Sequence, residues 1–161
     1  MNRDVECRAY FEKVGLALAV CQQVEEELKR YITMSLELAS KLIGNEMTFR
    51  FTGEDYQDRS LERLIDAFRK LCGNDPLRER LDKFRHDRNF VSHQSIVRCM
   101  NPDGDLEFSA EDRQRLEQIR LSGDKLVEDI GQECARIGVR LWFDDLTKEG
   151  SPESQTKHNP Q

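Results

Sequence analysis

The sequence has few aromatic residues and no long apolar run. Aromatic side chains make up 7% of the 161 residues, whereas charged side chains make up 35%. No apolar stretch approaches the roughly 20 residues that a membrane-spanning helix needs, and the N-terminal segment lacks the layout of a secretory signal peptide. We therefore expect one soluble, helix-rich domain that is cytoplasmic and has no membrane partner.

The sequence also lacks paired cysteines and an excess of positive charge. Its five cysteines are scattered and contain no Cys-x-x-Cys pair. This spacing argues against a zinc site or a disulfide framework and favours thiols that behave as small apolar side chains. The formal net charge of -6 argues against a general nucleic-acid binder but leaves a local basic patch open. We expect neither a metal nor another cofactor.

Apolar residues recur at helical spacing in four segments, which predicts an all-α bundle of four to five helices. The first helix is expected at about residues 4–42, with Gly44 as its stop. It is longer than an average helix, so it should span the whole domain. The second helix is expected at about residues 57–71.

The third helix should begin with Asp75 as its N-cap and Pro76 at the first helical position. The fourth should begin after a cap at Ser109 and carry a long apolar stripe. Gly123 lies on this stripe, where it would permit a neighbouring helix to approach closely.

The segment between the third and fourth helices has a different pattern. Residues 96–100 and 105–108 flank an Asn-Pro-Asp-Gly turn sequence, which predicts a short β-hairpin insertion. The end of the chain is polar. We therefore expect one helical domain over residues 1–147 and a disordered tail over residues 148–161.

The third helix carries Arg88, Asn89 and His93 within six residues. Arg88 falls on an apolar stripe whose other members are Leu77, Leu81, Phe84 and Val91. A guanidinium on a core-facing stripe is unfavourable unless it is paired or directed at an anion. Glu25 occupies a similar inward position on the first helix, so we expect Glu25 and Arg88 to lie within direct or one-water reach.

The pattern Arg88-Asn89-x-x-x-His93 resembles the arginine-asparagine-x-x-x-histidine motif of the HEPN superfamily. The general plan is similar too, because those proteins are small helical bundles with a long first helix and the motif on a late central helix. The resemblance extends over about residues 10–141, and Glu25 matches an acidic or polar first-helix residue that faces the motif. It implies a metal-independent RNA endonuclease, often a toxin or a phage-defence effector, that works as a homodimer.

The resemblance also implies roles for individual residues. His93 would act on the 2′-hydroxyl or the leaving oxygen, Arg88 would hold the scissile phosphate, and Asn89 would orient the substrate or the motif. Glu25 and Ser92 would support them. Further candidates for RNA contact are Lys83, Arg85 and His86. An antitoxin or regulatory protein is an implied partner.

Elementary chemistry agrees with these roles. RNA carries its own nucleophile, the 2′-oxygen, and histidine titrates in the range that proton transfer at neutral pH requires. Arginine offers parallel donors to the developing phosphate charge. On a regular helix, however, Arg88 and His93 would lie roughly 140° apart. Either the helix loosens near Ser92 or the two groups meet across a dimer.

One position departs from a subfamily that pairs with a nucleotidyltransferase antitoxin. That subfamily has a tyrosine two residues after the histidine, where this sequence has Ser95. Regulation by nucleotide transfer onto this position is therefore in doubt.

Other readings remain open. In one alternative, Arg88 forms a purely structural ion pair with Glu25 or Asp66. In another, His93 serves only to interact with the helix dipole. The basic residues of the third helix would then form a solvated face. The alternative function is a non-catalytic HEPN-like binding or dimerisation module for RNA, a nucleotide or a protein partner.

Overall fold

The computed structural model describes residues 3–44, 47–100 and 106–149. In this part of the chain the fold is all-α, as predicted, and four α-helices are joined by short helical turns. The α-helices are α1 (Arg3–Ile43), α2 (Leu61–Leu71), α3 (Asp75–Asn89) and α4 (Ala110–Glu149). The turns are η1 (Gly53–Tyr56), η2 (Phe90–Gln94) and η3 (Val97–Cys99). Among the described residues, no helix combines the length and the apolarity that a membrane span requires.

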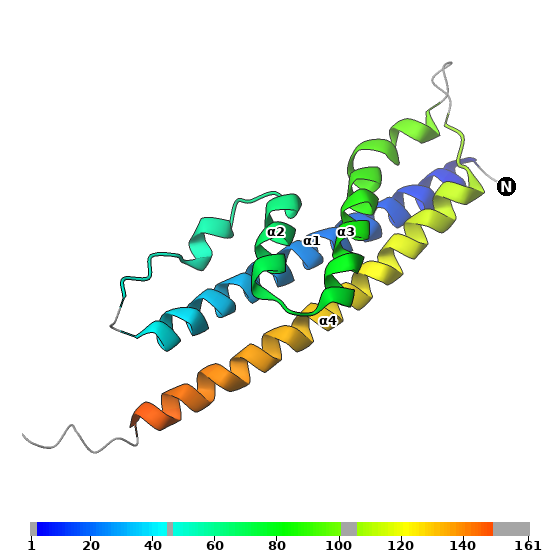
Figure 1. The fold of residues 1–161 in the computed structure, drawn as a ribbon. Coiled ribbons are helices and arrows are strands. Elements are labelled where there is room, and N and C mark those ends of the chain that lie inside the picture. The colour runs from blue at the N-terminus through cyan, green and yellow to red at the C-terminus, as the bar shows by residue number, and fades with distance from the viewer. Residues whose placement is uncertain (1–2, 45–46, 101–105, 150–161) are drawn as a thin grey trace, which may run out of the picture.

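The two long helices, α1 and α4, run side by side in the same direction (Figure 1). Each is about 60 Å long at 1.5 Å per residue. Lys13 Nζ lies 3.4 Å from Glu117 Oε2 near their starts, and Met34 lies against Gly138 further along. Because the pair is parallel, the intervening chain must travel back along it, and α2, α3 and the η turns make this return (Figure 1).

The core lies between the long pair and the crossing helices. The apolar stripes of α1 and α4 bury one another and contact α2 and α3. The largest side chains that are almost completely buried include Tyr10, Phe68, Phe84, Phe90, Leu28 and Ile32. Most of the two stripes is therefore core, although Val139, Trp142 and Phe143 near the end of α4 stay more than half exposed.

Three helices come close together at Gly123. An added Cβ would lie 2.8 Å from Val20 Cγ1 on α1 and 3.1 Å from Phe84 Cε2 on α3. Both distances are shorter than ordinary van der Waals contact. The predicted close approach at this glycine is confirmed.

The boundaries of α1 and α2 follow local backbone chemistry. α1 ends where Gly44 adopts a positive φ of 61°, and its N–H donates to Ser40 O at 3.2 Å. α2 begins at Leu61, four residues later than predicted. The reason is that Gly53–Tyr56 forms a separate 3₁₀ turn, and Ser60 stays extended as the N-cap.

The starts of α3 and α4 are each set by a capping side chain. The N-cap of α3 is Asn74, whose Oδ1 accepts from the Leu77 N–H at 3.2 Å, and not the predicted Asp75. Pro76 is at the second helical position. Ser109 caps α4 as predicted, and its Oγ accepts from the Asp112 N–H at 3.0 Å.

The predicted β-hairpin is not confirmed. In the described residues its first arm contains the 3₁₀ turn η3, and a single antiparallel bridge joins Met100 to Leu106. The reason is packing: Cys99 is buried, and the Phe108 ring packs 4.8 Å from the Tyr10 ring of α1, centroid to centroid. The predicted turn lies outside the described residues. Of the predicted tail, Lys148 and Glu149 belong to α4, and residues 150–161 lie outside the described residues.

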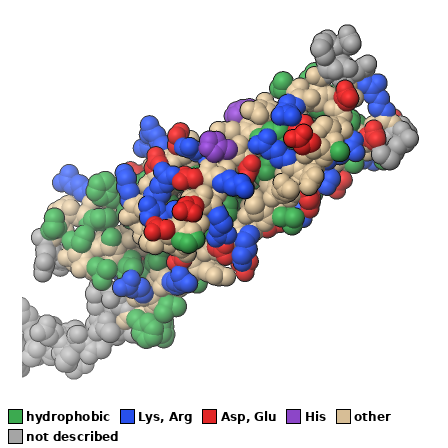
Figure 2. Space-filling view, turned by 45° about the vertical axis from the view of Figure 1, so that its right-hand side comes forward, with side chains coloured by type: hydrophobic (Ala, Val, Ile, Leu, Met, Phe, Trp, Pro, Cys, Tyr) green, Lys and Arg blue, Asp and Glu red, His purple; other side chains and the backbone are tan. Residues whose placement is uncertain are grey.

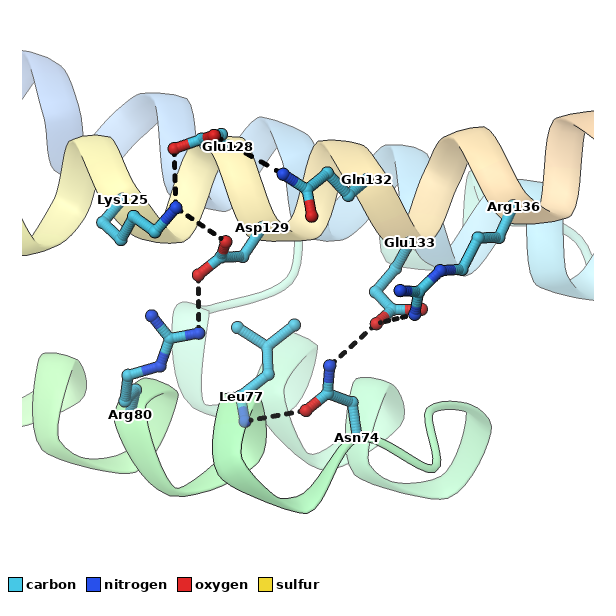
Figure 3. A network of polar contacts seen from close by, with 9 residues as sticks. All are labelled: Asn74, Leu77, Arg80, Lys125, Glu128, Asp129, Gln132, Glu133 and Arg136. Atoms are coloured by element: carbon cyan, nitrogen blue, oxygen red, sulfur yellow. Dashed lines mark hydrogen bonds and ion pairs between the residues drawn. The ribbon is translucent and has the colours of Figure 1, made fainter.

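A polar network attaches the start of α3 to the middle of α4 (Figure 3). Asn74 Nδ2 donates to Glu133 Oε1 at 2.8 Å, and Arg80 lies 2.6 Å from Asp129 Oδ2. Lys125 also approaches Asp129, at 3.2 Å. This network fixes the N-terminal half of α3 on α4, and so determines where the C-terminal half points.

We predict opposite effects for two alanine substitutions in α4. Gly131→Ala, where nothing lies within 4 Å of the added Cβ, should raise the free energy of unfolding by about 0.5–1 kcal/mol, because glycine is a poor helix former. Gly123→Ala brings the same gain, but it must displace Val20, which costs about 1–3 kcal/mol. Urea denaturation of both variants measures the difference, and equal stabilities would contradict the close packing.

Candidate functional site

The Arg88–His93 segment contains a change of helix type. α3 ends at Asn89 as a regular helix, and Phe90–Gln94 continues it as a π turn. The Ser95 N–H donates to Phe90 O, five residues back, at 2.9 Å. Turns of this kind inside helices occur often at functional sites. The helix therefore loosens around Ser92. This was one of the two ways in which the sequence analysis expected Arg88 and His93 to meet.

The π turn changes the direction of His93 relative to Arg88. The turn absorbs one extra residue, so five residues cover the rotation that four cover in a regular helix. The angle between the two positions therefore falls from roughly 140° to roughly 40°. Within a single chain, Arg88 and His93 lie on neighbouring parts of one face.

The predicted proximity of Glu25 and Arg88 is confirmed. Arg88 Nε lies 3.4 Å from Glu25 Oε1, and both side chains are only partly exposed. Asp66, the other partner considered, pairs with Arg69 at 3.4 Å. Glu25 takes only the Nε edge of the guanidinium. Among the described residues no acceptor takes the N–H groups of Nη1 and Nη2, so the end of the fork is open to an anion.

The thiol beside this pair is not a nucleophile. Burial raises the pKa of Cys21 to about 12, and the Glu25 carboxylate adds to the effect, whereas Arg88 opposes it. A thiol with such a pKa stays protonated at neutral pH. Cysteine chemistry therefore does not fit this face, and His93 is the side chain of the motif that is proposed for proton transfer.

The other predicted site residues on this stretch face solvent. Asn89, Ser92 and His93 are exposed, and so are His86 and Lys83. In Figure 2, lysine and arginine side chains (blue) lie close to the histidines (purple) over the middle of the molecule, with carboxylates (red) between them. The local surface is therefore mixed in charge, although it is richer in cations than the net charge of -6 suggests.

Several of the basic side chains are already paired. Arg85 Nη1 donates to Glu62 Oε1 of α2 at 3.0 Å, and Arg80 pairs with Asp129. Arg80 and Arg85 therefore fit the alternative interpretation, in which the basic residues form a solvated face with salt bridges. Lys83 differs, because no described residue forms an ion pair with it, so it is the candidate most available to an RNA phosphate.

A groove of about 980 Å³ runs between α3 and α4 on another side of α3. Of the predicted residues, only Lys83 lines it. The sequence reading missed Asp87 and Arg115, which meet at 3.6 Å in this groove, and the stacking of Arg115 on the Phe90 ring at 3.9 Å. Apolar side chains form part of its lining, namely Phe84, Ile119 and Leu126. No signal in the sequence relates Arg115 to α3, because the pairing depends on the helix crossing.

Ser95, which the motif resemblance places at the tyrosine position of that subfamily, is fully buried. Its hydroxyl donates to Val91 O at 2.6 Å. A buried hydroxyl that is already bonded cannot reach a nucleotidyl donor, so the doubt about that form of regulation is reinforced. Within the described residues, no three side chains of the metal-ligating types gather into one group.

The Arg88–Glu25 pair predicts a measurable coupling. Glu25→Gln should lower the free energy of unfolding by about 1 kcal/mol, because it leaves a partly buried guanidinium without its partner. Arg88→Met should cost a similar amount, and the double variant should cost less than the sum of the two. A double-mutant cycle in urea tests this, and additive losses would show that the two side chains do not interact.

Comparison with known proteins identifies no relative of this chain. No protein-family model, no curated protein and no solved structure matches the chain.

Proposed function

We propose that this protein is an RNA endonuclease of the HEPN type that cleaves through the RNA 2′-hydroxyl without a metal. The observation that carries the proposal is the π turn at Phe90–Gln94, whose geometry turns the exposed His93 to within roughly 40° of Arg88, and the Nη end of that arginine is open. An arginine fork and a histidine are the two groups that this reaction needs. The resemblance of the motif to that family supports the same assignment.

In the proposed reaction one proton leaves the 2′-hydroxyl and one reaches the departing 5′-oxygen; His93 makes one of these two transfers, and water makes the other. The 2′-oxygen then forms a bond to phosphorus, and the bond between phosphorus and the 5′-oxygen breaks. Arg88 holds the non-bridging oxygens through Nη1 and Nη2, while Glu25 holds its Nε. Asn89 and Ser92, both exposed, orient the strand. The products are a 2′,3′-cyclic phosphate and a 5′-hydroxyl.

The same resemblance supports a biological role as a toxin or an antiviral effector, held in check by an antitoxin or regulatory protein. This role depends on the RNA cleavage itself.

The reaction predicts a sharp difference between matched variants. His93→Ala and Arg88→Ala should each lower kcat for RNA cleavage by about 10²- to 10⁴-fold, since proton transfer and charge stabilisation contribute effects of this size. Arg78→Ala is the control. Arg78 is on the same helix, is 35% exposed against 34% for Arg88, and is likewise ion-paired, with Asp75 at 2.6 Å. This control should retain kcat.

The assay uses labelled single-stranded RNA with EDTA present, and the product ends are analysed. Cleavage should persist, because neither proposed group requires a metal. Wild-type protein that binds RNA and leaves it intact would favour the binding module, for which the existing Arg88–Glu25 pair is the supporting observation. Cleavage that survives the double variant would place the chemistry elsewhere.

We also propose a homodimer that brings two motifs together. The apolar surface that supports it follows the motif directly along the chain. Ile96, Val97 and Met100 are 46%, 66% and 54% exposed, and Ile96 lies three residues after His93. Such neighbouring apolar side chains on a surface favour association with another chain.

The dimer predicts a particle of twice the 18.8 kDa chain mass at micromolar concentration. Val97→Arg should convert it to the single-chain mass, because a charge on the apolar contact opposes association. Leu121→Arg, a similar change at a 54% exposed residue of α4, should leave the mass unchanged. Light scattering after size-exclusion chromatography measures all three, and an unmodified chain that is monomeric at these concentrations would contradict the proposal.

A further inference from the structure

The π turn creates a specific hydrogen-bonding problem in the backbone. In a regular helix, the Ser95 N–H would donate to Val91 O, four residues back. Here it donates to Phe90 O instead. Val91 is buried, so its carbonyl needs another donor, because an unpaired buried carbonyl is unfavourable. Without a replacement, the segment would gain by returning to regular helical geometry.

The side chain of Ser95 supplies that donor. Its Oγ lies 2.6 Å from Val91 O, and the residue has no exposed surface. Ser95 therefore uses both of its donors within the turn, the backbone N–H on Phe90 O and the hydroxyl on Val91 O. Alanine at this position could serve only one of these two carbonyls.

A second side chain holds the end of the turn from α1. The Tyr10 hydroxyl donates to Ser95 O at 2.7 Å, and the residue is 1% exposed. Its ring is fixed against Phe108. Burial raises the pKa of Tyr10 to about 12, and the nearby Asp112 carboxylate adds to this, so the phenol remains a donor at neutral pH. Each end of the Ser95 peptide unit is thereby tied to a partner.

We propose that Ser95 and Tyr10 are positioning residues, which hold the Phe90–Gln94 segment as a π turn and so keep His93 on the Arg88 face. The effect of this on catalysis rests on the proposed function, whereas the effect on the backbone does not. If the segment became regular helix, His93 would rotate away from Arg88 by roughly 100°. A nucleic-acid phosphate held by Arg88 would then be out of reach of the imidazole.

Two substitutions test the proposal, and the chain offers a matched control for each. Ser95→Ala removes the hydroxyl, and Ser35→Ala removes the same kind of bond, from Ser35 Oγ to Tyr31 O at 2.8 Å, in a regular part of α1. Tyr10→Phe removes only the phenolic oxygen. Tyr31→Phe is its control, because Tyr31 is also a buried α1 tyrosine, and its hydroxyl donates to a backbone carbonyl, Leu71 O, at 3.3 Å.

The first readout is the acceptor of the residue-95 amide, observed by NMR through-hydrogen-bond coupling between ¹⁵N and the carbonyl ¹³C. In the unmodified protein the coupling should reach Phe90. In Ser95→Ala it should move to Val91, since the carbonyl that loses its hydroxyl donor recruits the amide. Tyr10→Phe should weaken the Phe90 coupling, and both controls should leave it intact. A coupling to Phe90 that is undiminished in both test variants would overturn the proposal.

The second readout is RNA cleavage. Ser95→Ala should lower kcat by about 10²-fold or more, because misplacing a catalytic group by only about 1 Å already has effects of this order and the expected rotation is larger. KM should change little, since Arg88 and the exposed basic residues are untouched. Ser35→Ala and Tyr31→Phe should retain kcat. Equal losses of kcat in test and control variants would show a general structural effect and contradict positioning. If the unmodified protein cleaves no RNA, the proposed function fails, and the amide coupling alone then decides whether the turn is held in this way.

Discussion

The parallel pairing of α1 and α4 is the constraint on which the rest of the molecule depends. Two antiparallel helices can be joined by a short loop, whereas two parallel helices require a return path as long as themselves. The segment between Ile43 and Ala110 makes this return. It must also cover the groove between the long helices. α2 and α3 therefore cross the pair, and the crossing is close enough that Gly123 has no room for a Cβ beside Val20 and Phe84.

This crossing places the motif. The network of Asn74 and Arg80 with α4 fixes the beginning of α3, and the Arg88–Glu25 pair fixes its end on α1. Beyond Asn89 the chain must still reach the start of α4, so its last helical turn lies against the N-terminal part of α1. Tyr10 meets that turn there. The geometry around His93 is thus set by contacts with α1 more than by the motif's own sequence.

Much of this arrangement could be predicted from the residues, and some of it could not. The stripes, the Ser109 cap, the role of Gly123 and the contact between Glu25 and Arg88 were predictable, because a charge on an inward face needs a partner and few were available. The shift of the α3 cap to Asn74 is a one-residue ambiguity between two good capping residues. The hairpin is not confirmed: in the described residues a single bridge joins Met100 to Leu106, and Cys99 and Phe108 pack on the bundle. The groove contacts of Arg115 depend on the crossing, which no local pattern describes.

The sequence indicated only that the helix had to loosen if Arg88 and His93 were to share a face. It did not show which contacts would hold the π turn. In the sequence, Ser95 was noted only because it stands where a subfamily has a tyrosine. Its structural role depends on its two donors and on the hydroxyl of Tyr10, 85 positions earlier in the chain.

The turn also has a consequence for how such a chain can change over generations. It holds one residue more than a regular helix would use. Deleting one codon between Arg88 and His93 would therefore restore the regular helix and leave the histidine four residues after the arginine, still roughly 40° from it. Deleting the codon of Gln94, after the histidine, would restore the regular helix at the original spacing of five, and the histidine would turn away by roughly 100°. A length change of one residue would here keep or separate two functional groups according to the side of the histidine on which it falls.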